Sequence, residues 1–280
     1  MGKKKTDNIQ NEIIAAVTAA KPESLSACGR APRPDHAGNI VQLVQWGHSR
    51  LAADHVLFPE INGELLETVS GAIRQLSVKF FMAKLSAGLS AEERASRILL
   101  RFRAYEYLLE TSLNFLGLES RWLEEDEKAL AFEFVLETLA SLEEIEIREY
   151  GAAYISATAV GRILAGMEIV QGGASMVAKT AARIREAIGA SDELPVSIHF
   201  LVEAGEEIAD NIYYQMVLEG KCKFGNDYAL GLRWLRHLGF EQVSTNPVLA
   251  AKAYEDDPTL IGIFKSEIVN HPNYEAWKAA

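Results

Sequence analysis

Residues 240–249 read Phe-Glu-Gln-Val-Ser-Thr-Asn-Pro-Val-Leu, and this stretch decides how the end of the chain is interpreted. The β-favouring residues 240–245 predict a strand. A residue before proline is pushed out of the α region, so we expect Asn246 to stay extended at the carboxyl end of that strand. Pro247 lacks an amide hydrogen and suits the first turn of a helix, which the sequence predicts over residues 248–254.

The residues before this stretch show the same alternation of strand and helix. Residues 228–238 predict an amphipathic helix with Leu230 and Trp234 on its apolar side, and Gly239 stands where its C-terminal cap is expected. Residues 221–224, Lys-Cys-Lys-Phe, predict a first strand. Strand, helix, strand and helix at this spacing form a βα repeat, which implies parallel strands.

The chain before residue 220 has a helical pattern. Apolar residues recur at three- and four-residue steps over residues 65–80, which is the spacing of one helix face. Ser90 and Glu93 form a capping box that opens a further helix, and Gly117 is its expected end. Another long helix is predicted over residues 130–147.

Two features of the helical region allow more than one interpretation. Pro195 suits the start of a helix, although a strand over residues 196–202 is the alternative. The glutamates at 143, 144, 146 and 149 could suggest a carboxylate metal site. No Glu-x-x-His motif accompanies them, so we expect a solvated helix face instead.

These patterns predict a mostly α fold in three parts. Residues 1–40 are expected to be a flexible N-terminal segment, and residues 41–219 a helical domain. Residues 220–280 are expected to form the first two βα units of an incomplete (β/α)8 TIM-type barrel.

Composition limits the classes of partner. The formal net charge is −11 and the isoelectric point is near 5.1, which argues against a nucleic-acid binder, since such proteins need clustered lysine and arginine. No apolar run has the length of a membrane span, so no membrane partner is expected. Cys28 and Cys222 lie far apart and in no metal-ligand spacing, and a reducing cytoplasm is the expected location.

Residues 242–249 resemble the second barrel strand of the transaldolase family, whose hallmark there is Thr-Thr-Asn-Pro. Ser244 replaces the first threonine and keeps a hydroxyl group. In that family the asparagine hydrogen-bonds substrate hydroxyls around a Schiff-base carbon, and an aspartate that ends the first strand acts as general acid and base. Asp227 lies at the matching distance before Asn246.

The resemblance therefore implies Asp227 and Asn246 as catalytic residues and Ser244, Thr245 and Asn226 as their substrate-binding neighbours. Asn226 is also the rival of Asp227 for the inward-facing position, because the phase of the strand decides which side chain points inward. The resemblance implies neither a metal ion nor an organic cofactor.

The implied activity belongs to sugar-phosphate metabolism of the pentose phosphate type. Family members transfer or cleave a dihydroxyacetone unit through an imine with a lysine on the fourth strand. Lys252 and Lys265 follow Asn246, but neither is expected to end a fourth strand. A barrel needs eight βα units. We therefore expect the chain to be an inactive N-terminal piece of a larger protein, completed by the rest of the barrel or by an oligomer partner.

The competing hypothesis is a non-catalytic helical module that binds a partner protein. In that case Asn246, followed by Pro247, is only a helix cap, and Asp227 is another, because either residue type caps helices well.

Overall fold

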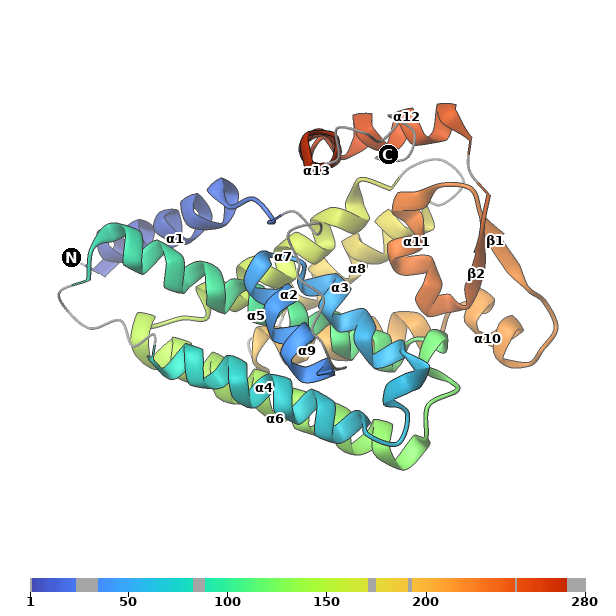
Figure 1. Cartoon of the computed structure of the whole chain (residues 1–280), viewed down its shortest axis with the longest axis horizontal. Coiled ribbons are helices and arrows are strands. Elements are labelled where there is room, and N and C mark those ends of the chain that lie inside the picture. Colours follow the sequence, from blue (N-terminus) through green and yellow to red (C-terminus); the bar gives the residue numbers. More distant parts are fainter. Residues whose placement is uncertain are drawn as a thin grey trace.

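The computed structural model describes residues 2–23, 35–82, 89–170, 175–190, 193–244 and 246–270 (Figure 1). Most of these residues are helical, and the predicted mostly α class is confirmed. The helices that precede the strands are α1 (Gly2–Ala19), α2 (His36–Trp46), α3 (Ser49–Ala53), α4 (Leu65–Met82), α5 (Ala91–Leu116), α6 (Glu125–Tyr150), α7 (Tyr154–Glu168), α8 (Met176–Ala190), α9 (Val196–Ala209) and α10 (Ile212–Leu218).

Helix α5 lies at the centre of the helical region. It packs against α1, α2, α3, α4, α6, α7 and α9. It begins at the predicted capping box, where the Ser90 hydroxyl accepts from the Glu93 amide at 3.1 Å and the Glu93 carboxylate accepts from the Ser90 amide at 2.8 Å. Its C-cap is Gly117, as predicted. Phe102, Tyr105 and other apolar residues of α5 form the middle of the core.

The helices around α5 form where the spacing of apolar residues predicts helices. Helices α4 and α6 run side by side (Figure 1), and α7, α8 and α9 pack on one another. The strand alternative for residues 196–202 is wrong, because this segment begins α9 directly after Pro195. The buried residues of α9 follow helical steps: Ser197, His199, Phe200, Leu201, Ala204 and Ile208.

The N-terminal segment also contributes to the fold. Helix α1 contacts α5 and α7, and Ile13 is fully buried in the same core. Helix α2 begins at His36, with the Asp35 carboxylate accepting from the Gly38 amide at 2.8 Å. Residues 24–34 lie outside the described part of the chain.

Within the described residues, two short strands follow the helical region: β1 (Phe224–Asn226) and β2 (Phe240–Val243). The first strand was expected at 221–224, and this placement is wrong. Strand β2 begins only after the turn at Gly239, so β1 has no residue to pair with before Phe224. Lys221 and Lys223 are accordingly exposed.

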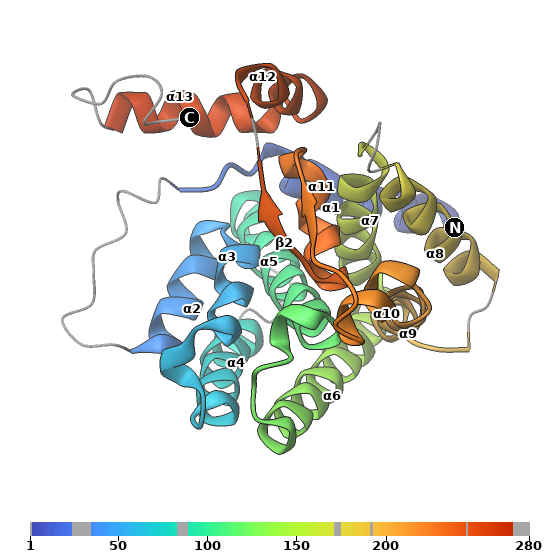
Figure 2. The same cartoon turned by 90° about the vertical axis from the view of Figure 1, so that its right-hand side faces the viewer.

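The strands pair in parallel, as predicted. Phe224 lies opposite Phe240 and Gly225 opposite Gln242, so Glu241 is an extra residue of β2. The connection between the strands is α11 (Ala229–Leu235) followed by the 3-10 turn η6 (Arg236–Leu238). Helix α12 (Pro247–Asp256) follows β2 and lies above the carboxyl end of that strand, and helix α13 (Thr259–Asn270) extends away from the strands (Figures 1 and 2).

The strand unit and the helical region share one hydrophobic core. Helix α11 contacts α7 and α8, and its Trp234 is only 2% exposed. Tyr228, Leu230, Leu235 and Leu238 belong to the same cluster as the residues of α5. The domain boundary near residue 220 stays a prediction, and the packing across it is continuous.

Candidate functional site

The predicted site residues follow the carboxyl ends of two neighbouring parallel strands. Strand β1 ends at Asn226 and strand β2 at Val243. The amide of Ser244 donates to the carbonyl oxygen of Asn226 at 3.2 Å, so the pairing continues to the start of the motif. Because the strands are parallel, the residues that follow them leave from one edge of the sheet.

The residues that follow β1 differ in their surroundings. Asn226 is half-buried, and its side-chain amide donates to the backbone carbonyl of Tyr228, which closes the turn into α11. Asp227 is exposed, and it does not cap α11, because the N-cap of that helix is Tyr228 and has no side-chain cap bond. The cap interpretation of Asp227 is therefore wrong.

The residues that follow β2 contain a helix cap. Asn246 is extended, with φ −140° and ψ 168°, which confirms the effect expected from the following proline. Its side-chain oxygen accepts from the amides of Val248 and Leu249, both at 3.0 Å. The cap interpretation of Asn246 is confirmed. Thr245 lies outside the described residues.

The cap leaves part of the Asn246 side chain for another role. Its oxygen is engaged with α12, so the exposed side-chain amide group remains as a donor. Asp227 offers an acceptor and Ser244 an exposed hydroxyl at the same edge. No hydrogen bond joins Asp227 to Asn246 within the described part of the chain. These groups suit a ligand with several hydroxyl groups.

The lysines after the motif lie on helices. Lys252 belongs to α12 and contacts Asp256 at 3.3 Å, and Lys265 belongs to α13. Neither residue ends a strand, so neither stands where the family has its imine-forming lysine.

Sequence reasoning missed a second polar cluster, inside the helical region. Glu143 and Glu146 of α6 are 2% and 1% exposed, so the expectation of a solvated face is wrong for both. The Glu146 carboxylate accepts from the amides of Ile155 and Ser156 at the start of α7. The side-chain oxygens of Glu143 accept from Ser156 and from the start of α9. Both carboxylates serve as helix caps from a neighbouring helix.

The sequence holds one indication of this cluster, which is that two helix starts lack a capping side chain of their own. Ala153 and Pro195 are the N-caps of α7 and α9, and neither forms a side-chain cap bond. Uncapped buried helix starts need acceptors from elsewhere in the protein. The sequence does not say which of the many glutamates supplies them.

Burial changes the acidity of the carboxyl groups in the helical region. Burial raises the pKa of Glu146 to about 7, against the hydrogen bonds from Ile155, Ser156 and Tyr105. Burial likewise raises the pKa of Glu106, on α5, to about 7, although Arg162 opposes the shift. Arg162 forms an ion pair with Glu106, with its Nε 3.4 Å from the carboxylate, and water has little access to that carboxylate.

The described ranges contain neither a candidate metal site nor a candidate membrane span. No group of three or more histidine, cysteine, aspartate or glutamate side chains is arranged to hold a metal ion there. No helix in these ranges combines the length and the apolar character of a membrane span.

The chain was compared with models of protein families, with curated proteins and with solved structures. No family model, curated protein or solved structure matches it.

Proposed function

We propose that this chain provides the first two βα units of a transaldolase-like enzyme that transfers or cleaves a dihydroxyacetone unit of a sugar phosphate. The observation that supports the proposal is the parallel pairing of β1 with β2, because Asp227 and Asn246 follow the carboxyl ends of these two strands. The active sites of (β/α)8 barrels lie at that end of the strands.

The proposed chemistry gives each residue a role. Asp227, which is exposed and does not cap α11, moves protons to and from the substrate. Asn246 orients substrate hydroxyls with the amide group that its cap bonds leave free. Ser244, Thr245 and Asn226 are neighbours of the substrate. The nucleophile is a lysine on a later strand of the barrel, activated by burial. The proposed location is the cytoplasm.

The test is chemical trapping of the imine. The complete product of the gene that encodes this chain is incubated with fructose 6-phosphate, treated with borohydride and digested for mass spectrometry. We expect a dihydroxyacetone adduct on one lysine outside α12 and α13. The 280-residue chain alone is the control and should give no adduct.

The D227N variant of the gene product should keep a trappable imine when the keto sugar is supplied but turn over at least about a hundredfold more slowly. A gene product that gives no adduct and no turnover overturns the proposal. That outcome favours the helical interaction module.

A further inference from the structure

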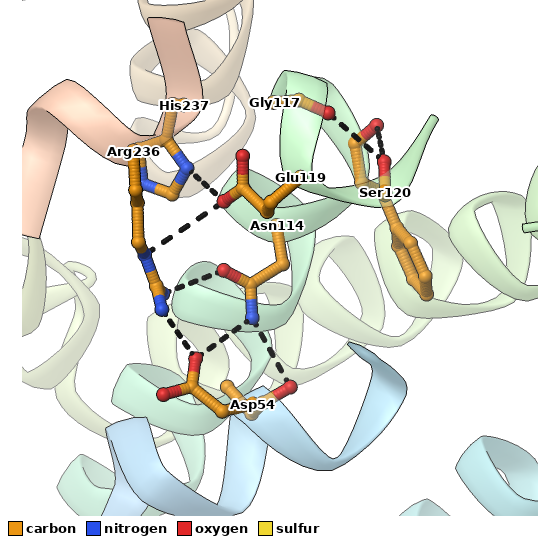
Figure 3. A network of polar contacts seen from close by, with 9 residues as sticks. Asp54, Asn114, Gly117, Glu119, Ser120, Arg236 and His237 are labelled. Carbon is orange, nitrogen blue, oxygen red and sulfur yellow. Dashed lines mark hydrogen bonds and ion pairs between the residues drawn. The ribbon is translucent and has the colours of Figure 1, made fainter. Parts of the chain in front are cut away.

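A partly buried polar network joins the end of α11 to the helical region (Figure 3). Arg236, in η6, donates to the Asp54 carboxylate at 2.7 Å and to the side-chain oxygen of Asn114 at 2.6 Å. Asn114, fully buried in α5, donates in turn to Asp54 and to the Ala53 carbonyl. The network therefore connects η6 with two elements of the helical region, η2 (Asp54–Leu57) and α5.

The neighbouring residue extends this network. His237 is fully buried, and its Nδ1 lies against the carboxylate of Glu119, in the 3-10 turn η4 (Leu118–Ser120). The same carboxylate lies 3.7 Å from the Nε atom of Arg236. Burial opposes the charge of Arg236, but the carboxylates of Asp54 and Glu119 outweigh it and raise the pKa of the guanidinium. Both carboxylates therefore favour the charged form of the arginine.

The backbone packs closely around the same two residues. A Cβ atom on Gly117 would lie 2.9 Å from the Cα of His237, so only glycine lets η4 approach η6 this closely. Gly239, between His237 and β2, has φ 83° and packs against Val217. Strand β2 begins one residue later. The network therefore holds the chain immediately before the strand.

An aromatic cluster holds the same end of the sheet from α10. The rings of Phe224 and Phe240 stack at 5.2 Å, and Tyr213 meets them edge-on at 4.9 and 5.5 Å. These two phenylalanines are the first pair of the ladder. Contacts from the helical region thus reach the first residue of each strand.

We propose that the helical region positions the strand pair, with Arg236 and Glu119 as positioning residues for the edge that carries Ser244 and Asn246. Strand β2 has only four residues, so the place where it begins determines where its carboxyl end emerges. The consequence for catalysis rests on the proposed function, whereas the positioning of the strand does not.

Hydrogen–deuterium exchange of the 280-residue chain tests the positioning. The reporter is the amide of Ser244, which donates to Asn226 at the far end of β2. R236M keeps most of the side-chain volume and removes the charge-assisted hydrogen bonds, so Ser244 should exchange about tenfold faster. Amides in the middle of α8 should keep their protection.

The matched control is R121M. Arg121 pairs with Glu241 of β2, but both side chains are about half exposed, so this surface pair should contribute little. We expect the exchange of Ser244 in R121M to match that of the unchanged protein. An R236M protein whose Ser244 exchanges at the original rate, or whose α8 amides accelerate equally, overturns the inference.

E119Q provides a second test if R236M fails to fold. It keeps an acceptor for His237 and removes the negative charge next to Arg236, so Ser244 should again exchange faster while α8 does not. Unchanged exchange in this variant also overturns the inference.

Enzyme kinetics of the gene product distinguish an effect on positioning from an effect on substrate binding. R236M should lower kcat for the ketose phosphate more than it changes KM, because the groups at the strand ends are misaligned for the chemical step. If the exchange result holds in a protein without aldolase activity, the proposed function fails and the positioning inference stands.

Discussion

The Glu143 carboxylate accepts hydrogen bonds from both the amide and the hydroxyl of Ser197, which lies 54 residues later in the chain. Ser197 belongs to the first turn of α9, a helix whose N-cap is Pro195 and has no side-chain cap bond. The Glu143 side chain also accepts from the hydroxyl of Ser156 at 2.9 Å. One residue in the last half of α6 thus binds the starts of two other helices.

Removing this carboxylate should destabilise the helical region. In E143Q an NH2 group replaces one of the two carboxylate oxygens. This NH2 group can only donate, so the buried N–H and O–H groups that bonded to that oxygen lose their acceptor. We expect a loss of about 3 kcal/mol in the free energy of unfolding, measured by urea denaturation. E144Q is the matched control, because the Glu144 side chain is 71% exposed, and it should stay within about 0.5 kcal/mol of the unchanged protein.

Glu146 should make the stability of the protein depend on pH. Its pKa is about 7 in the folded protein and 4.5 as the ordinary value, so the folded state binds this proton more tightly than the unfolded state. The contribution of Glu146 to the free energy of unfolding is therefore most favourable below pH 4.5. It is lost as the pH rises towards 7 and above.

The comparison that checks this is between the urea midpoints of E146Q and the unchanged protein at pH 5, 6, 7 and 8. Because glutamine does not titrate, the midpoint of E146Q should fall less between pH 5 and 8. Parallel curves for the two proteins would contradict the prediction. E106Q should flatten the curve in the same direction, since the pKa of Glu106 is also about 7.

The parts of the fold that the sequence predicts are those with a local signal. The capping box at Ser90, the glycine stop at Gly117 and the left-handed cap at Gly239 each depend on a few neighbouring residues. The extended backbone of Asn246 depends on one following proline. These features are decided before tertiary packing, and the structure agrees with them.

The parts that the sequence does not predict depend on distant residues. The period of α6 places Glu143 and Glu146 on a face, but only the packing of α7 and α9 decides that this face is buried. The start of β1 depends on where β2 begins, 16 residues later. At the candidate site the alternation of strand and helix was predictable, but the strand ends were not, because β1 ends at Asn226 and β2 at Val243 instead of at 224 and 245. The exposure of Asp227 follows from the turn that makes Tyr228 the cap.

Gly239 should tolerate no side chain. G239A places a residue at φ 83° and puts its Cβ 2.7 Å from Val217, so both backbone strain and a clash oppose folding. Gly151 is the matched control, since it has φ 86° and an added methyl group there would meet nothing within 4 Å. We expect G151A to lose about 1 kcal/mol and G239A about 3 kcal/mol or more by urea denaturation. Equal losses would mean that the turn before β2 can move away from α10.

The two roles of Asn246 can be separated by substitution. Aspartate caps a helix as well as asparagine does, but its carboxylate has no amide group to donate. In the 280-residue chain, N246D should therefore keep the amide protection of Val248 and Leu249, whereas N246A should lose about 1 kcal/mol of local stability there. Under the proposed function, both variants should lose turnover of the ketose phosphate in the gene product. An N246D enzyme with unchanged kcat would leave the asparagine as a helix cap alone, because the donor would then have no part in the reaction.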